Sequence, residues 1–348
     1  MISTSTAPHA KPSDPAALAR RDTMLRLAVG VTLAFTLSEL MGWQPTFLAP
    51  LFFTILITAL PAAPPFRTGL MLVVVMTAAA SVAFVLPSLL RGTPIVMVGV
   101  LGLLVFFALL ASAQQRAKLP ALLLLISMST IPVVVMVAPN QAGLLPLAMV
   151  RSMALAVCTL WLTFAAWPRV APRTPPAAGA VASPAMTALA GTCVVMPLML
   201  IYLMFGLADA LPVLVTTALL VLTFDVRQGA MQGLAMMLAN LVGGLTAVTV
   251  YLLVGIAPSL IVLALLSFLV AVMFAVQIDR GGPRGAVAVI ASNSHLIILS
   301  SALAAGPDNS GIWLTRLFQF ALACVFAVGM MILVWGLAPS TATRPTGK

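Results

Sequence analysis

The chain has 348 residues, of which 62% are hydrophobic and only 7% are charged. Soluble domains carry about 25% charged residues, so this composition excludes a water-soluble globular protein. The formal net charge is +10, but no basic stripe with interleaved aromatics is present, so we attribute the charge to the cytoplasmic loops of a membrane protein and not to nucleic-acid binding.

The apolar sequence divides into twelve segments that approach the roughly 20 residues a helix needs to cross a bilayer. They are residues 23–41, 46–62, 67–90, 94–113, 118–138, 142–167, 184–207, 210–224, 228–254, 257–277, 284–304 and 310–338. The eighth segment is short, and we expect it to be tilted or broken. The predicted fold class is therefore an all-α polytopic membrane protein with about twelve transmembrane helices.

The polar segments are few. Residues 1–22 are polar and contain three prolines, so we expect a disordered cytoplasmic tail. Arginines before the first apolar run resemble the start of a signal peptide, but no small-residue cleavage site follows, which favours an uncleaved first span. We expect residues 169–183 to form an extended cytoplasmic linker, and residues 339–348 a second cytoplasmic tail.

Basic residues predict the orientation. With the N-terminus inside, most of the 17 Lys and Arg residues fall on the cytoplasmic side, and only Arg91 falls on an outer loop. The sequence thus predicts a multi-pass protein of the bacterial inner membrane with both termini in the cytoplasm.

The two halves of the chain resemble each other at one constant offset near the end of each half. The matched pairs there are Arg151 with Arg316, Ser127 with Ser292, Ser129 with Ser294, and Thr130 with His295. Each half contains six spans, an even number, so both halves enter the membrane in the same direction. We therefore expect two parallel six-helix repeats, residues 23–168 and 184–338, related by a pseudo-twofold axis along the membrane normal.

Arg151 and Arg316 are the strongest candidate functional residues. An ionisable side chain inside a span is costly and marks a functional path by default. The guanidinium stays protonated, so each arginine needs an anion, a carbonyl or water as its partner. Two interpretations stay open: the pair binds an anionic substrate, or each arginine bonds a carbonyl or carboxylate and fixes helix packing.

Two polar clusters accompany the arginines, each near the centre of the preceding span and at a similar depth to its arginine. The first comprises Ser127, Ser129 and Thr130, and the second comprises Ser292, Asn293, Ser294 and His295. If both pairs face the pseudo-twofold axis, the sequence predicts a midplane site for a small carboxylate, which arginine can bind through two hydrogen bonds. The alternative is that the hydroxyls only join neighbouring helices.

His295 and Glu39 are candidates for coupling transport to protons. His295 is the only histidine outside the N-terminal tail, and histidine is the side chain that ordinarily titrates near neutral pH. Glu39 lies near the outer end of the first span. The alternatives are a packed, hydrogen-bonded histidine and a solvated glutamate at the mouth of the path.

Several catalytic classes lack their sequence signatures. The chain has no phosphate-binding loop of the G-x-x-x-x-G-K-[ST] type and no H-E-x-x-H motif or Cys/His cluster, so we expect no ATPase, no metal site, no cofactor and no enzyme activity. Cys158, Cys193 and Cys324 all fall in apolar runs, where we expect small buried hydrophobes and no disulfide framework.

Residues 24–70 resemble the opening of the fusaric acid resistance-like superfamily of aromatic acid exporters. That pattern has an arginine at the start of the first span, an aromatic-rich second span, a short break, and an Arg/Gly start to the third span. The residues that carry it here are Arg26, Phe47, Phe52, Phe53, Pro61, Arg67 and Gly69. The compact chain looks like the twelve-span branch of uncharacterised DUF2955-type membrane proteins.

The resemblance implies an inner-membrane exporter of aromatic or other small organic acids that works with a periplasmic membrane-fusion adaptor. Larger members of the superfamily carry a cytosolic domain between the repeats, where this chain has only its linker. Distant relatives among plant malate channels keep an organic-anion channel open as an alternative. A third interpretation is a non-transporting membrane subunit of an efflux assembly.

Overall fold

The fold is taken from a computed structural model of the whole chain. It describes residues 15–60, 62–114, 117–170, 183–205 and 229–306, together with positions 318, 325–326, 329–330 and 333. The expected eighth span, most of the twelfth span, Arg316, Cys324, both tails before residue 15 and after residue 338, and most of the linker lie outside the described residues.

Every regular element in the described ranges is a helix. The α-helices are α1 Pro15–Leu40, α2 Leu48–Ala59, α3 Phe66–Leu89, α4 Pro94–Ala113, α5 Lys118–Val137, α6 Leu144–Ala166, α7 Pro184–Phe205, α9 Gly229–Ile256, α10 Leu260–Asp279 and α11 Gly282–Ala305, with a 3₁₀ turn, η1, at Pro139–Gln141. In this part of the chain, 9 helices are long and apolar enough to cross a membrane. The protein is thus a polytopic helical membrane protein.

The first helix begins at Pro15, earlier than the expected first span at residue 23. Proline is favourable in the first turn of a helix, where its missing N–H has no partner to lose. The alanines, leucines and arginines that follow are strong helix formers, so the helix continues beyond the apolar run at its N-terminal end.

The second helix is shorter than the expected span of residues 46–62. It covers only Leu48–Ala59, and nearly all of its residues are buried. Prolines at positions 45, 61, 64 and 65 explain its limits, because proline restricts the residue before it and cannot donate a backbone hydrogen bond. The result is a half-length helix joined to α1 by a non-helical connection at residues 41–47.

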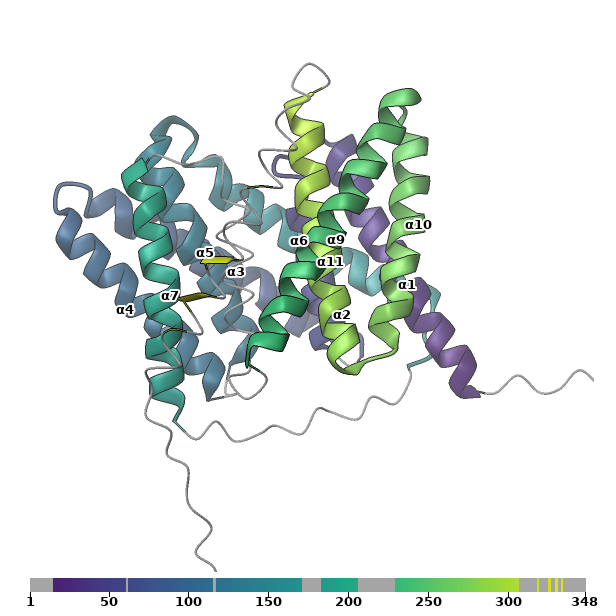
Figure 1. Ribbon diagram of the computed structural model, residues 1–348, viewed down its shortest axis with the longest axis horizontal. Coiled ribbons are helices and arrows are strands. Elements are labelled where there is room, and N and C mark those ends of the chain that lie inside the picture. Colours follow the sequence, from purple (N-terminus) through teal and green to yellow (C-terminus); the bar gives the residue numbers. More distant parts are fainter. Residues whose placement is uncertain are drawn as a thin grey trace, which may run out of the picture.

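The helices form two groups that meet through α2 and α6. In Figure 1, α3, α4, α5 and α7 lie together on the left, and α1, α9, α10 and α11 lie on the right. Helix α1, the first of the chain, packs along α10, while α7, the first helix after the linker, packs along α4. Each half of the chain therefore has its first helix packed against the other half.

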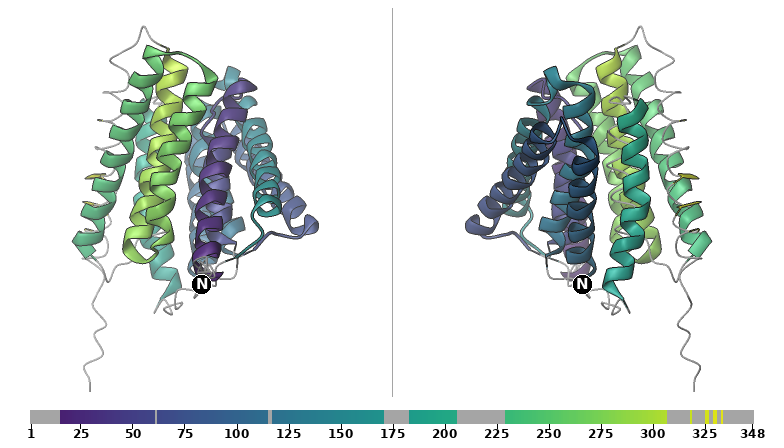
Figure 2. Two further views of the ribbon diagram at one scale, coloured as in Figure 1. Left: turned by 90° about the vertical axis from the view of Figure 1, so that its right-hand side faces the viewer. Right: turned by 90° about the vertical axis from the view of Figure 1, so that its left-hand side faces the viewer.

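The axes of the helices are roughly aligned, so the bundle has two ends (Figure 2). Charged residues distinguish these ends. Helices α1 and α10 are antiparallel, since Thr23 of α1 and Asp279 of α10 line one pocket. We call the end with this pocket the basic end, because Arg67 and Arg280 also lie at helix termini there. The opposite end holds Glu39 and is called the Glu39 end.

Glycines allow the closest helix contacts. A Cβ at Gly30 of α1 would overlap the ring of Phe53 on α2, and one at Gly243 of α9 would overlap the carbonyl oxygen of Ala291 on α11. Close backbone approach at small residues is the usual basis of helix association in a bilayer, where burial of apolar surface provides no driving force between helices.

Candidate functional site

Arg151 lies in the second turn of α6, on the side of the helix that faces the α1–α2 connection. Its Nη2 donates a hydrogen bond of 2.9 Å to the carbonyl oxygen of Gln44. Its guanidinium carbon lies 5.1 Å from the ring centroid of Trp43, a cation–π distance. Its Nε is buried and has no hydrogen-bond partner.

The positive charge of Arg151 is not neutralised within the described ranges, where it forms no ion pair with a carboxylate. A carbonyl bond of this kind was one of the two interpretations open from the sequence. The bond uses one of five N–H donors, so the remaining face of the guanidinium can still bind an anion. The expected partner across the axis, Arg316, lies outside the described residues.

The first polar cluster is buried on α5, and its hydroxyls bond within their own helix. Ser127 donates to the carbonyl oxygen of Leu123 at 2.9 Å, while Ser129 and Thr130 both donate to that of Ile126, at 3.0 and 2.7 Å. A hydroxyl has one proton, so these residues have no second donor for a ligand. Such bonds to a preceding carbonyl are the common state of Ser and Thr inside helices.

The second polar cluster is buried on α11 and bonds to α9. Ser294 donates to Oδ1 of Asn240 in a short hydrogen bond, and Nδ1 of His295 lies 3.2 Å from Oγ1 of Thr246. The imidazole ring of His295 also lies against Phe274 of α10, with centroids 6.1 Å apart.

Three buried polar atoms on α10 and α11 have no hydrogen-bond partner: Oδ1 of Asn293, Nε2 of His295, and Oγ of Ser267 on α10. A buried polar atom left without a hydrogen bond costs about 1–3 kcal/mol, so bound water or the polar groups of a ligand would stabilise this region. We call Asn240, Thr246, Asn293, Ser294 and His295 the polar centre.

The α1–α2 connection links Arg151 to α11. Oγ1 of Thr46 donates to Oε1 of Glu39 at 2.7 Å and is also 2.7 Å from Oγ of Ser300. Because the single proton of Thr46 points to Glu39, Ser300 is the donor in the second bond. Ser300 lies about 7.5 Å along α11 from His295, toward the Glu39 end.

The structure therefore brings some of the predicted site residues together and leaves others apart. Glu39 and Arg151 both bond the α1–α2 connection, at Thr46 and Gln44. No hydrogen bond between described residues joins Arg151 directly to Ser292 or to the polar centre. The α5 cluster contacts α6 where Oγ of Ser127 lies 3.8 Å from the sulfur of Met149.

Several polar residues of this region were not singled out by the sequence, namely Thr46, Thr246, Ser267 and Ser300. Single Ser and Thr residues of this kind are common in the chain, and many of them bond only their own helix, so they do not stand out in the sequence. The internal repeat does not point to Ser300 either. At the offset that pairs Ser127 with Ser292, the position that matches Ser300 is Val135.

At the basic end, Arg26 is buried and held by neighbours. Its Nη2 donates to Thr23 at 3.0 Å and to the carbonyl oxygen of Arg169 at 3.1 Å, and its guanidinium lies 4.3 Å from the ring centroid of Phe164. These contacts join the first half of α1 to the C-terminal end of α6, which is a packing role.

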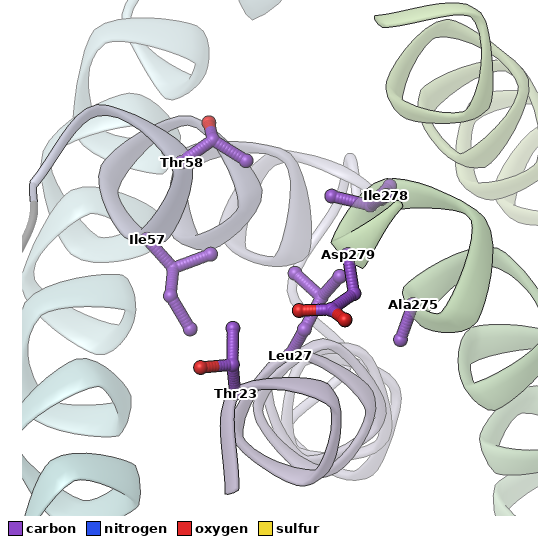
Figure 3. Close-up of a pocket in the computed structure, with 7 residues that line it drawn as sticks. All are labelled: Thr23, Leu27, Ile57, Thr58, Ala275, Ile278 and Asp279. Carbon is purple, nitrogen blue, oxygen red and sulfur yellow. The ribbon is translucent and has the colours of Figure 1, made fainter. Parts of the chain in front are cut away.

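A small pocket lies beside Arg26 between α1, α2 and α10. Figure 3 shows its lining residues, Thr23, Leu27, Ile57, Thr58, Ala275, Ile278 and Asp279. It has room for about one water molecule, so it is too small for an organic acid in this conformation.

The cysteines are placed differently from the expectation of buried hydrophobes. Cys158 on α6 and Cys193 on α7 are free thiols, and both are exposed. In the described part of the chain, no group of three or more His, Cys, Asp or Glu residues gathers to hold a metal ion.

Comparison with known proteins relates the first half of the chain to a protein family. Residues 23–163 match the family model described as Protein of unknown function (DUF2955). No curated protein and no solved structure matches the chain. The matched range runs from α1 through nearly all of α6, so the first six helices carry the sequence pattern of an uncharacterised family of membrane proteins.

Proposed function

We propose that this chain is a secondary transporter of the bacterial inner membrane that exports small hydrophobic or aromatic organic anions. The observation that carries the proposal is the state of Arg151. Arg151 belongs to the membrane-length helix α6, and its partly exposed side chain bonds the carbonyl oxygen of Gln44, has a buried Nε without a partner and forms no ion pair with a described carboxylate. An unneutralised positive charge in a membrane span favours an anionic guest.

The proposed architecture is twelve spans in two parallel repeats with both termini in the cytoplasm. Reciprocal packing supports it, since the first helix of each half packs on the fourth helix of the other: α1 on α10, and α7 on α4. Packing within the halves is also alike, with α5 against α3 and α4 in the first and α11 against α9 and α10 in the second. The short α2 then corresponds to the short eighth segment.

In the proposed mechanism, the carboxylate of the substrate binds Arg151 and its apolar body lies against the surrounding aliphatic side chains. Rocking of one repeat against the other would expose this site to each side in turn, as parallel and inverted repeats do in known transporter folds. His295, with its free Nε2, and Glu39 are the proposed proton-coupling residues. A periplasmic membrane-fusion adaptor would receive the exported acid.

The test is uptake of radiolabelled benzoate, a small aromatic carboxylate, into everted membrane vesicles energised by a proton gradient. We expect Arg151→Gln to lower the initial rate at least about tenfold, because one charged hydrogen bond to substrate is worth about 1.5–3 kcal/mol. Arg151→Lys keeps the charge but loses the planar fork, so it should retain part of the rate.

Arg91→Gln is the matched control, since Arg91 is exposed in the turn between α3 and α4. Equal rates for Arg151→Gln and the unchanged protein, at matched expression, would contradict the proposal. Uptake that follows membrane voltage and continues after the proton gradient is collapsed would instead favour the anion channel.

A further inference from the structure

The α1–α2 connection, residues 41–47, crosses the Glu39 end of the bundle between α6 and α11. It has no helical structure, yet Thr46 and Phe47 are buried, with 0% and 4% of their surface exposed. Non-helical backbone within a membrane protein is tolerated where it is buried by protein or lines a water-filled path. The last two residues of the connection, Thr46 and Phe47, therefore lie in the protein interior, while Met41, Gly42 and Gln44 are exposed.

Polar bonds hold the connection on both sides. Arg151 of α6 bonds the carbonyl oxygen of Gln44, and Ser300 of α11 bonds the hydroxyl of Thr46. These two bonds tie one short segment of the first half of the chain to helices from both halves. They are also made by side chains, which can break and reform without unfolding a helix.

The Thr46 hydroxyl has three features of a latch. It is fully buried, its proton is directed to Glu39 at 2.7 Å, and its oxygen accepts from Ser300 at 2.7 Å. Glu39 is half-buried. Arg151 is the charged residue of a neighbouring helix that bonds the connection. Separation of α11 from α2 breaks the Ser300 bond alone and leaves the Glu39 bond within the α1–α2 hairpin.

We propose that residues 41–47 form a gate at the Glu39 end of the transport path, and that the Thr46–Ser300 hydrogen bond is its latch, closed in this structure. The gate lies over the polar centre, since Ser300 is on α11 between His295 and the Glu39 end of the helix. The role of the gate rests on the proposed function, with the Glu39 end taken as the periplasmic face. The opening of the gate can be measured without substrate.

The first test uses a cysteine at Ser292 as a reporter of access to the interior, in a chain whose Cys158, Cys193 and Cys324 are alanine. A membrane-impermeant maleimide is applied to intact cells and, separately, to everted vesicles. We expect Thr46→Val to raise the labelling rate about two- to tenfold from one side only, because loss of one hydrogen bond changes the open population by about that factor.

Thr249→Val is the matched control, since Thr249 is exposed on α9 and its hydroxyl bonds its own helix at Leu245. It should leave the labelling rate unchanged. Equal labelling of the Thr46→Val and Thr249→Val chains from both sides would overturn the gate.

The second test holds the gate closed with a disulfide. It also tests the gate if Thr46→Val fails to fold. The pair Thr46→Cys and Ser300→Cys, in the same cysteine-free chain, replaces two hydroxyls whose oxygens are 2.7 Å apart, so oxidation should join them. We expect the oxidised pair to lose benzoate uptake into everted vesicles and to regain it on reduction, while the oxidant should not change the uptake rate of the single variant Thr46→Cys.

Undiminished uptake by the oxidised pair, or failure of the pair to cross-link, would overturn the gate. Absence of benzoate uptake by every variant, the unlinked chain included, would count against the proposed function. In that event the labelling rates still decide whether the gate opens.

Discussion

The bond between Asn240 and Ser294 lies inside the contact of α9 with α11, and both side chains are buried. In a bilayer such a bond contributes little, because separated helices find other partners. A double-mutant cycle with Asn240→Ala and Ser294→Ala should therefore give a coupling energy of about 0.6 kcal/mol, and no more than about 1.7 kcal/mol, measured by reversible unfolding in mixed micelles.

The control cycle combines Asn240→Ala with Thr249→Val. The hydroxyl of Thr249 bonds only within α9, so this cycle should give no coupling energy. A coupling near zero in the Asn240–Ser294 cycle as well would show that the hydrogen bond is replaced by water or by another neighbour.

At this scale the sequence predicts which residues are unusual but not what they bond. Arg151 was recognised as a charge inside a span, yet its carbonyl partner belongs to Gln44, in a non-helical segment 107 residues away. Ser129 and Ser294 occupy matching positions, but one bonds its own helix and the other bonds Asn240. Side-chain rotamers and neighbouring helices decide between these outcomes, and sequence spacing contains neither.

Among the helices, the contact of α9 with α11 depends on Gly243. A Cβ there would overlap the backbone of Ala291 and lie close to Ser294, and backbone cannot move aside as a flexible side chain can. Gly243→Ala should destabilise the protein by about 1–3 kcal/mol, the usual effect of overpacking, measured as a lower melting temperature in detergent.

Gly255→Ala in the same helix is the matched control, because a Cβ at Gly255 meets no atom within 4 Å. Alanine favours helix over glycine by about 1 kcal/mol, so this variant should melt at the same temperature or higher. Equal melting of both variants below that of the unchanged protein would mean that the glycines act through flexibility and not through close contact.

The apolar segments predicted the helices better than their ends. Ten of the expected spans correspond to described helices, because long apolar runs have few alternatives in a membrane protein. Helix α1 begins before its expected span because strong helix formers precede the apolar run. Helix α2 is shorter than its expected span because prolines flank it. The burial of Thr46 and Phe47 at the end of the α1–α2 connection could not be predicted, since the composition of residues 41–47 resembles an ordinary loop.

For the whole molecule, periodicity and span counting predict parallel halves but not how they pack. The reciprocal arrangement of α1 on α10 and α7 on α4 joins residues far apart in the chain, and all four helices are apolar enough to cross a membrane. An apolar face of this kind has the same composition whether it meets lipid or another helix, so packing partners come only from the structure.

Orientation is the property of the whole molecule that basic residues predict most directly. In the fold, Arg91 lies at the Glu39 end, in the turn after α3, while Arg280 lies at the opposite end, after α10. With Cys158, Cys193 and Cys324 replaced by alanine, Arg91→Cys should react with an impermeant maleimide in intact cells, and Arg280→Cys should react only in everted vesicles. The excess of arginine and lysine at the basic end favours its retention in the cytoplasm. The reverse labelling pattern would place the Glu39 end in the cytoplasm and turn the proposed exporter into an importer.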